Sequence, residues 1–323
     1  MSEKIVLLDK TSQERANEIL PHVPEGMTFV HGVAEGTDYL KEIIRDADYA
    51  IAGQVAVTGE VLRAATKLRL LHKSGVGVDN IDIASARELG IMVARTPGSN
   101  AVPVAEFALG SAIAALRGLA YGNANLKNGE WRGPGKLPNK TFILTGKTVG
   151  IIGFGAIGQA FAKLLQGFGC TILYSQRSRL VPERERELKA AYASLDQILE
   201  TADLISLNCP LTSETANLID RAAFSKMKPS AVLVNVARGG IVVEKDLIWA
   251  LENRIIAAAA VDVFEQEPLP ADSPLLRPID NLVLTPHIAA VAADTFAPTL
   301  QRIFRNIVSV AKGEAIAEGD RVV

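Results

Sequence analysis

Short, apolar, β-branched runs alternate with longer helical segments along the whole chain, and this alternation restricts the fold more than any other feature. A strand, a crossover helix and a further strand form the repeating unit of a parallel sheet. The pattern therefore predicts an α/β protein. Before residue 100 the runs are IVLLD (5–9), YAIAG (49–53), LRLLHKSG (68–75) and IMVAR (91–95).

The middle of the chain interrupts this pattern. The segment VPVAEFALGSAIAALRGLA (102–120) is too long and too rich in alanine for a strand, so it predicts a buried helix with Pro103 in its first turn. NGEWRGPGKLPNK (128–140) predicts a surface loop. The segment 295–314 has apolar residues at helical spacing and is expected to pack back on the first domain. From Lys147 onward the β-runs return and predict one doubly wound sheet: TVGIIG, CTILYS, LISLN, AVLVNVA, IAAAAVDVF and LVLTPH.

Composition sets the broad class. With 323 residues and 48% hydrophobic side chains, the chain is long enough for two ordinary domains. A net charge of −2 gives no reason to expect nucleic acid or an anionic membrane as partner, so a small-molecule substrate is favoured. Cys170 and Cys209 lie in apolar runs, which favours core packing over a disulfide or a metal site. No apolar run approaches the ~20 residues of a membrane span, and the N-terminus does not resemble a signal peptide. We expect a cytoplasmic protein.

Three glycines stand between a β-branched run and a helical one in GKTVGIIGFGAIGQAFAKLLQGFG (146–169). Gly153 allows a tight turn, Gly155 lets the backbone approach a pyrophosphate, and Gly158 lets the helix pack closely on the strand. The helix N-terminus adds free N–H groups and a positive dipole end for the phosphates. Glycine triplets also mark purely structural turns, but this strand-to-helix context predicts a dinucleotide site.

The end of the next strand distinguishes two cofactors. An NAD site usually carries an acidic residue there, which binds the ribose hydroxyls. Here the stretch reads YSQRSR, with Gln176 in place of the acid, and Arg177 and Arg179 are suited to pairing with a 2′-phosphate. Two hydroxyl groups in the same stretch add donors, those of Ser175 and Ser178. The alternative is a solvated basic turn; the missing acid favours NADP(H), with NAD as the alternative cofactor.

Three polar side chains stand at or just beyond the ends of apolar strands, where open α/β sheets bind ligands. They lie in VNVARGG, VDVFEQEPLP and LTPHIAA, and they are Arg238, Glu267 and His287. Singly, each residue is more often a surface or capping group. Their combination is harder to explain as three unrelated surface groups.

These stretches together resemble the D-2-hydroxyacid dehydrogenase family, also called D-isomer-specific 2-hydroxyacid dehydrogenases. The resemblance extends over nearly the whole chain. SGVGVDNID (74–82) and TPGSNAVPVAEF (96–107) are similar to the family's substrate loop and domain-crossing helix. The other hallmarks stand as GxGxxG (153–158), NCPLT (208–212), NVARGG (235–240), DVFEQEP (262–268) and TPHIAA (285–290).

The resemblance implies two doubly wound parallel-sheet domains. A Rossmann cofactor domain, residues 102–292, would be inserted in a flavodoxin-like substrate domain, residues 1–101 plus 293–323. The family also implies a homodimer with the long helix after Pro103 in the interface. Pro103 departs from the family, which commonly has a small residue there, and this puts the helix start and the nicotinamide contacts of Val104 and Glu106 in question.

The family chemistry fits the residue types. Arg238 would grip the substrate carboxylate and the adjacent oxygen. His287 would take the hydroxyl proton in oxidation and return it in reduction, and Glu267 would fix the ring and favour imidazolium. No metal is expected.

The rest of the expected site follows from the same resemblance. Lys73 occupies a position that is often basic in relatives handling phosphoglycerate, although a solvated lysine is the plainer interpretation. Three histidines lack motif context and receive no role: His22, His31 and His72. The expected substrate contacts are Lys73, Ser74, the backbone around Val76 and Gly77, and Asn100. Further expected cofactor contacts are Val104, Ala156, Ile157, Cys209, Pro210, Thr215, Ala237 and Asp262.

The basic loop is most similar to that of glyoxylate and hydroxypyruvate reductases, so we expect reduction of a small 2-ketoacid to glycolate or D-glycerate. A 3-phosphoglycerate dehydrogenase, or a D-lactate or bulky 2-ketoacid reductase, is the alternative within this class. The end of the chain at Val323 argues against the regulatory domain that many phosphoglycerate dehydrogenases carry. A dinucleotide-gated binding protein, like the family's corepressors, is the alternative from another class.

Overall fold

Some inner strands of this protein are apolar at every position, as is typical of strands covered on both faces. Two examples are β3 (Tyr49–Ala52) and β11 (Ala258–Val261), each buried along its whole length. The computed structural model describes residues 2–131, 137 and 140–323. More than half of the loop expected over residues 128–140 lies outside the described residues.

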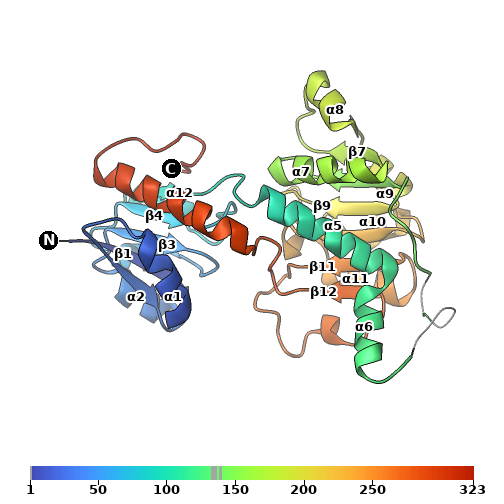
Figure 1. The fold of residues 1–323 in the computed structure, drawn as a ribbon, viewed down its shortest axis with the longest axis horizontal. Coiled ribbons are helices and arrows are strands. Elements are labelled where there is room, and N and C mark those ends of the chain that lie inside the picture. The colour runs from blue at the N-terminus through green and yellow to red at the C-terminus, as the bar shows by residue number, and fades with distance from the viewer. Residues whose placement is uncertain (1, 132–136, 138–139) are drawn as a thin grey trace. The chain divides into compact units, whose positions relative to one another are not determined.

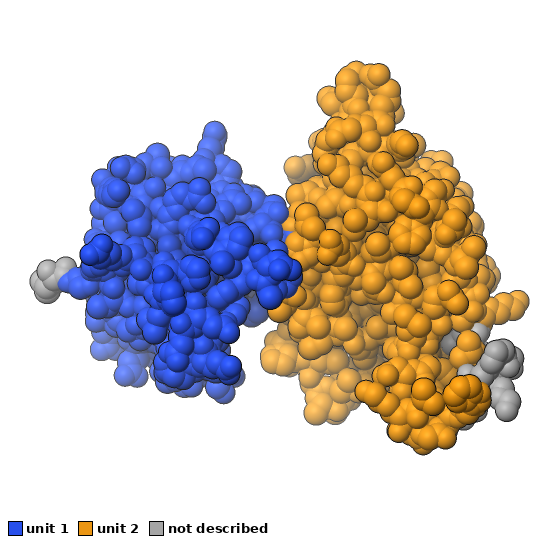
Figure 2. Space-filling model, in the orientation of Figure 1, with its two compact units in different colours: residues 1–100, 292–323 blue, residues 101–291 orange. Residues whose placement is uncertain are grey.

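The chain forms two units, shown in Figures 1 and 2. Unit 1 comprises Met1–Asn100 and Ala292–Val323, and unit 2 comprises Ala101–Val291. Each unit has its own sheet, and every strand pair in both sheets is parallel. The predicted fold class, two doubly wound parallel sheets, is therefore confirmed.

Unit 1 has five strands in the order β2-β1-β3-β4-β5, the flavodoxin-like order. Side-chain oxygens of Ser12, Thr58 and Asp82 accept a backbone N–H at the starts of α1, α3 and α4, which fixes where these helices begin. The strands are β1 (Glu3–Lys10), β2 (Met27–Gly32), β3, β4 (Leu70–Lys73) and β5 (Met92–Ala94). The helices are α1 (Gln13–Ile19), α2 (Thr37–Ile44), α3 (Gly59–Ala64), α4 (Ile83–Glu88) and α12 (Ala293–Ala311), with a short 3₁₀ turn at Leu20–His22.

Helix α12 returns to unit 1 as its sequence pattern predicts. Leu300, Ile303, Phe304 and Ile307 pack on one face of the five-stranded sheet. A buried polar network also ties this helix to β4. Its members, called here the His72 network, are His72, Arg302, Asn306 and Asp320.

The contacts of the His72 network are all within unit 1. Asn306 Nδ2 lies 3.0 Å from His72 Nε2 and donates to Asp320 Oδ2 at 2.9 Å. Arg302 donates to both carboxylate oxygens of Asp320 and to the Pro97 carbonyl oxygen at 2.9 Å. The Arg302 hydrogen bonds hold the pKa of Asp320 below its usual range, so the network carries a fixed ion pair.

Unit 2 has seven strands in the order β12-β11-β10-β9-β6-β7-β8, which is the Rossmann order with one further strand. Its helices α9 and α10 begin at the capping side chains of Ser194 and Asp220. The strands are β6 (Thr148–Ile152), β7 (Thr171–Ser175), β8 (Ala190–Tyr192), β9 (Leu204–Leu207), β10 (Val232–Asn235), β11 and β12 (Leu282–Leu284). The α-helices are α5 (Ala101–Arg117), α6 (Leu119–Lys127), α7 (Ala156–Leu165), α8 (Pro182–Leu188), α9 (Leu195–Thr201), α10 (Arg221–Lys226) and α11 (Glu244–Glu252). Short 3₁₀ turns lie at Gln166–Phe168, Gly239–Ile241 and Pro274–Leu276.

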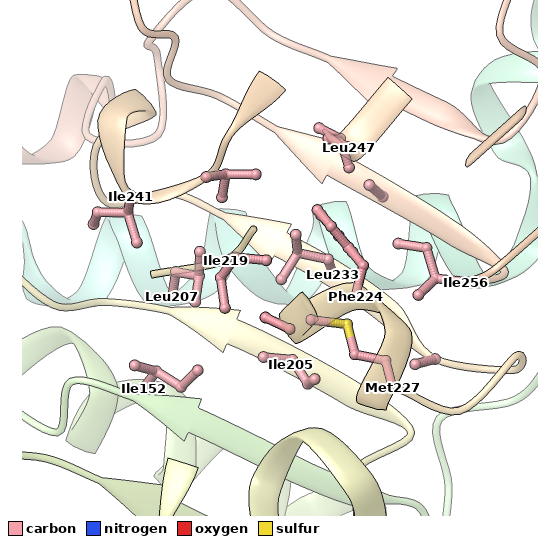
Figure 3. Packing of buried hydrophobic residues seen from close by; sticks show 14 of the residues in the cluster. Ile152, Ile205, Leu207, Ile219, Phe224, Met227, Leu233, Ile241, Leu247 and Ile256 are labelled. Carbon is pink, nitrogen blue, oxygen red and sulfur yellow. The ribbon is translucent and has the colours of Figure 1, made fainter. Parts of the chain in front are cut away.

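Both faces of the seven-stranded sheet are covered. On one face Phe224 of α10 and Leu247 of α11 pack against Ile205 and Leu233 of the sheet (Figure 3). On the other face α5 and α7 cover the strands. This double cover leaves the ends of the parallel strands as the places where polar side chains can gather.

Helix α5 differs in length from the helix expected over 102–120. Its buried face is built from small residues, among them Ala105, Ala108 and Ala112, which let the helix lie close to the strands. It ends at Arg117 because Gly118 adopts a left-handed φ of 62°, and α6 continues at an angle of 66°. The expectation of one helix through residue 120 was wrong in its last turn. Within the described residues, no helix taken singly is long and apolar enough to cross a membrane, and only the bent pair α5–α6 meets that test.

Candidate active site at the strand ends of unit 2

Three neighbouring strands of unit 2 each lead into one of the polar residues expected to act in catalysis. Arg238 follows β10, Glu267 follows β11, and His287 follows β12. Because β10, β11 and β12 are adjacent and parallel, their carboxyl ends meet at one edge of the sheet. All three residues therefore emerge at the same edge of unit 2.

The closest contact in this group joins His287 to Glu267. His287 Nδ1 lies 2.5 Å from Glu267 Oε2, and the two side chains are 25% and 32% exposed. A carboxylate only accepts, so Nδ1 carries the proton. His287 Nε2 makes no hydrogen bond with any residue that the structure describes, so this nitrogen is available to a ligand.

Glu267 is held in its ionised form. Partial burial raises its pKa, but the hydrogen bond from His287 and the Phe264 N–H at 2.9 Å outweigh burial, and the net effect lowers the pKa. The charge of Arg238 acts in the same direction. Glu267 is therefore a fixed negative charge behind the imidazole.

The backbone at His287 has a left-handed φ of 54°, which is rare outside glycine and asparagine. Asp262, which is only 1% exposed, stabilises this backbone conformation. Its carboxylate accepts from Thr285 Oγ1 at 2.6 Å, Ile288 N at 3.0 Å and Ala289 N at 2.8 Å. Its carbonyl oxygen accepts from His287 N at 2.8 Å. The sequence suggested a cofactor contact for Asp262; the structure uses its carboxylate to position the His287 loop.

Arg238 is anchored at its own backbone by the end of β10. Asn235 Nδ2 donates to the Arg238 carbonyl at 2.9 Å, and Asn235 Oδ1 accepts from Ala237 N at 3.1 Å. A Cβ on Gly239 would lie 1.8 Å from the Phe264 carbonyl carbon, so only glycine lets the β10 and β11 loops touch. Asn235 and Gly239 were not singled out from the sequence, although Gly239 lies in the NVARGG motif.

The three glycines after β6 have different surroundings. Gly153 has φ 89°, and a Cβ there would lie 2.4 Å from Cys209 N. A Cβ on Gly158 would lie 2.4 Å from the Gly153 carbonyl oxygen, so this glycine permits the close contact of α7 with the turn. Gly155 is the N-cap of α7, and a Cβ at this position would meet no atom within 4 Å. A tight turn, an open backbone position and a helix N-terminus fit a pyrophosphate group.

The loop after β9 lies against this turn. Cys209 is buried, and burial raises the pKa of its thiol to about 11, so it is an inert packing group. Thr215 Oγ1 donates to the Pro210 carbonyl at 2.6 Å and closes the loop on itself. Three further expected cofactor contacts have these positions: Ala156 and Ile157 in the first turn of α7, and Ala237 buried after β10. Val104 is 3% exposed and packs in the core of unit 2.

The YSQRSR loop after β7 is a closed turn. Gln176 Nε2 donates to the Ser178 carbonyl at 2.6 Å, and Ser175 ends the strand. Arg177, Ser178 and Arg179 are all exposed, but Arg179 also forms an ion pair with Glu185 at 2.8 Å while its side chain is 62% exposed. The structure thus gives the two arginines different surroundings, which the sequence did not indicate.

Most of unit 2, which carries these residues, matches a known protein family. Residues 109–289, more than half of the chain, match the family described as D-isomer specific 2-hydroxyacid dehydrogenase, NAD binding domain. This chain belongs to that family. It is an NAD(P)-dependent dehydrogenase, and its unit 2 binds a nicotinamide dinucleotide.

The similar proteins carry the names of two different enzymes, glyoxylate reductase and D-3-phosphoglycerate dehydrogenase. A glyoxylate reductase from Korarchaeum cryptofilum is 37% identical over 275 residues, which cover 84% of this chain and 82% of that protein. A D-3-phosphoglycerate dehydrogenase from Archaeoglobus fulgidus is 35% identical over 318 residues, which cover 96% of this chain and 58% of that protein. The crystal structure of a glyoxylate reductase from Paecilomyes thermophila has a TM-score of 0.82 at 29% identity, covering 100% of this chain and 99% of that one.

Unit 1 of the dehydrogenase holds the loop that resembles the family's substrate loop. The interpretation of Lys73 as a solvated side chain was wrong, because this residue is 6% exposed. Its ammonium donates to the Gly53 carbonyl and to Asn80 Oδ1, the latter at 2.8 Å. Asn80 Nδ2 in turn donates to the carbonyls of Gly53 and Val55 at 3.1 and 2.6 Å. Lys73 therefore supports the start of the loop from within unit 1.

The remaining expected substrate contacts lie at the same end of this sheet. Ser74 N donates to the Ala52 carbonyl at 2.9 Å, which continues the β3–β4 pairing into the loop. Val76 and Gly77 are partly exposed in the loop itself. Asn100 Oδ1 is buried and has no hydrogen-bond partner among the described residues.

Proposed function

We propose that the enzyme reduces a small 2-ketoacid, glyoxylate or hydroxypyruvate, to the D-2-hydroxy acid with NADPH. The pairing of His287 Nδ1 with Glu267, which leaves Nε2 open, carries the proposal for the chemistry. The glyoxylate reductase relatives support the substrate class. The missing acid at Gln176 and the exposed cation at Arg177 support the choice of NADPH.

The residues of this chain would divide the reaction as follows. The bound nicotinamide supplies the hydride in reduction. The Arg238 guanidinium binds the substrate carboxylate in a bidentate manner and orients the carbonyl. His287 donates a proton from Nε2 to the carbonyl oxygen, while Glu267 holds the ring and stabilises its charged form.

A 3-phosphoglycerate dehydrogenase remains the second candidate because relatives with that name match nearly the whole chain. Lys73 weakens this candidate. It binds the Gly53 carbonyl and Asn80 inside unit 1, so it is not a solvent-facing group for a phosphate.

We also propose that the enzyme is a homodimer, as the family resemblance implies. Exposed apolar side chains at both ends of α6, Leu119 and Leu126, and at Ile143 after it, support an interface on this part of unit 2. The molar mass from light scattering tests it, and a monomer at micromolar concentration would contradict it.

The test of the function is a panel of 2-ketoacids assayed with both reduced cofactors. Glyoxylate, hydroxypyruvate, pyruvate and a bulky 2-ketoacid are each reduced with NADPH and with NADH, and 3-phosphoglycerate is assayed in oxidation. We expect the highest kcat/KM for glyoxylate or hydroxypyruvate with NADPH. A higher value with NADH would contradict the cofactor, and a higher value for 3-phosphoglycerate would favour the second candidate. Binding of cofactor without turnover of any acid would favour a dinucleotide-gated binding protein.

A further inference from the structure

The two arginines of the YSQRSR loop lie in different electrostatic surroundings. Arg179 donates from Nε and Nη2 to the two carboxylate oxygens of Glu185, at 2.9 and 2.8 Å. Such a two-point contact fixes the plane of the guanidinium. Glu185 lies on α8, which follows the loop beside β7 (Figure 1), and it is only 9% exposed.

Glu185 is itself tied to the core. The Tyr174 hydroxyl, on a ring that is fully buried, donates to Glu185 Oε1 at 2.7 Å and accepts from Leu180 N at 2.9 Å. The contacts among Tyr174, Arg179 and Glu185 thus join β7, the end of the loop and α8. The hydrogen bonds from Arg179 and Tyr174 lower the pKa of Glu185 to about 2. The carboxylate therefore stays charged at neutral pH and in moderate acid.

Arg177 has no such partner. It is exposed and makes no hydrogen bond or ion pair with any residue that the structure describes. The charge of Arg177 influences the pKa of Glu214, which lies in the loop after β9. Hydrogen bonds from Thr212, from the Glu214 backbone and from Ser213 lower the pKa of Glu214, and Arg177 lowers it further. Arg177 is therefore a solvent-facing cation that a carboxylate influences only at a distance.

We propose that Glu185 determines which arginine recognises the 2′-phosphate: it neutralises Arg179 and leaves Arg177 as the phosphate-binding residue. The inference rests on the proposed use of NADPH and goes beyond it, since the sequence treats the two arginines alike. A phosphate next to Arg179 would also meet the Glu185 carboxylate, and the repulsion offsets the attraction. Next to Arg177 it meets an unneutralised guanidinium. Arg179 then serves to hold the loop, and Glu185 acts through it as a positioning residue.

The experiment compares 2′,5′-ADP with 5′-AMP as probes in titration calorimetry, so that turnover is not needed. Wild type should bind 2′,5′-ADP more tightly. Arg177→Ala should raise the Kd for 2′,5′-ADP by roughly tenfold or more and leave 5′-AMP binding unchanged. Glu185→Gln should have the opposite effect, a several-fold lower Kd for 2′,5′-ADP alone, because the charge of Arg179 is no longer neutralised.

Two further variants make the result specific. Glu183→Gln removes a carboxylate from the same helix, one that is paired with Arg186 on the surface, and should change neither Kd. The double variant Arg179→Met with Glu185→Gln removes a pair of no net charge and should keep the wild-type ratio of the two Kd values. It also provides the test if Glu185→Gln alone does not fold.

The outcomes separate the two proposals. If wild type binds both probes equally, the enzyme has no 2′-phosphate site, and the NADPH proposal and this inference both fail. If wild type discriminates but the double variant loses as much discrimination as Arg177→Ala, Arg179 is a phosphate ligand and only the inference is overturned. Weaker 2′,5′-ADP binding by Glu185→Gln would overturn it as well.

Discussion

His72 in unit 1 and His287 in unit 2 are each held by hydrogen bonds to the ring, and the two arrangements are opposite. His72 in unit 1 is fully buried, with Nδ1 2.8 Å from the Lys73 carbonyl and Nε2 3.0 Å from Asn306 Nδ2. His287 in unit 2 is partly exposed and has one charged partner, Glu267, at 2.5 Å. Both nitrogens of the first ring have hydrogen-bond partners, whereas Nε2 of the second has none among the described residues.

The partners explain what each ring can do. A carbonyl accepts, so His72 Nδ1 carries a proton, and the Asn306 amide donates, so His72 Nε2 must accept. A second proton on this ring would place two donors face to face. Burial accordingly lowers the pKa of His72 to about 4, against the opposing effects of the Lys73 carbonyl and Asp320. In contrast, a carboxylate behind His287 stabilises the charged ring. The comparison teaches that the acidity of the partner and access to the second nitrogen separate a structural histidine from a catalytic one.

Removing the imidazole of His287 should have the largest effect. Asparagine tolerates the left-handed φ of 54°, so His287→Asn should keep the loop while removing the proton donor. We expect kcat for reduction to fall by ~10²-fold or more, which is usual for loss of a general acid. The Kd for the cofactor and the melting temperature should stay close to those of wild type.

The matched variant is His72→Gln, which removes the other imidazole. It should lower the melting temperature and keep kcat within a few-fold of wild type. If His287→Asn lost stability rather than rate, or His72→Gln lost rate rather than stability, the division of roles between the two rings would be wrong.

The second largest effect is on stability in acid: we expect the free energy of unfolding to fall at low pH because His72 becomes protonated more readily in the unfolded chain. The pKa of this ring is about 4 in the folded state against an ordinary value of 6.5, so the unfolded chain binds the proton first as pH falls. Stability is full above pH 6.5 and declines as pH falls toward 4, by ~2 kcal/mol at pH 5. Urea unfolding at pH 8, 6 and 5, with hydrogen exchange of peptides from β4 and α12, measures this decline.

His72→Gln should flatten this part of the pH dependence, since the variant has no ring to protonate. His31→Gln is the control, because it removes a partly exposed histidine from the same unit. An acid decline that is equally steep in wild type and in His72→Gln would assign it to other groups, such as the carboxylate of the His72 network.

The sequence predicted the inner strands of both sheets and the edge strands β5 and β12, and it missed the edge strands β2 and β8. The runs around β1, β3 and β6 are largely apolar because these strands are covered on both faces. β2 and β8 lie at the edges of their sheets, with partly exposed residues and only three residues in β8. β2 and β8 contain exposed residues and therefore have no distinctive composition, so each is defined mainly by the strand with which it pairs.

The same reasoning separates the predictable part of the site from the rest. Arg238, Glu267 and His287 stand at strand ends, and strand ends can be located from the sequence. The role of Asp262 depends on a loop that returns to it 23 to 27 residues later, and this distance cannot be read from local pattern. Lys73 is similar: its acceptors come from the end of β3 and from a later loop, so a basic residue that looked solvated is buried.

The smallest effect concerns the carboxylate that distinguishes His287 from His72. Glu267→Gln keeps a hydrogen-bond acceptor for Nδ1 but removes the negative charge, so the imidazolium form loses part of its stabilisation. The alkaline limb of the pH–rate profile for reduction should then move to lower pH, and the change should be small because the pair is partly exposed and solvent screens it. The rate at the acidic end of the profile should change much less. An unchanged profile would mean that Glu267 only orients the ring, and the contrast between the two histidines would then rest on the open Nε2 alone.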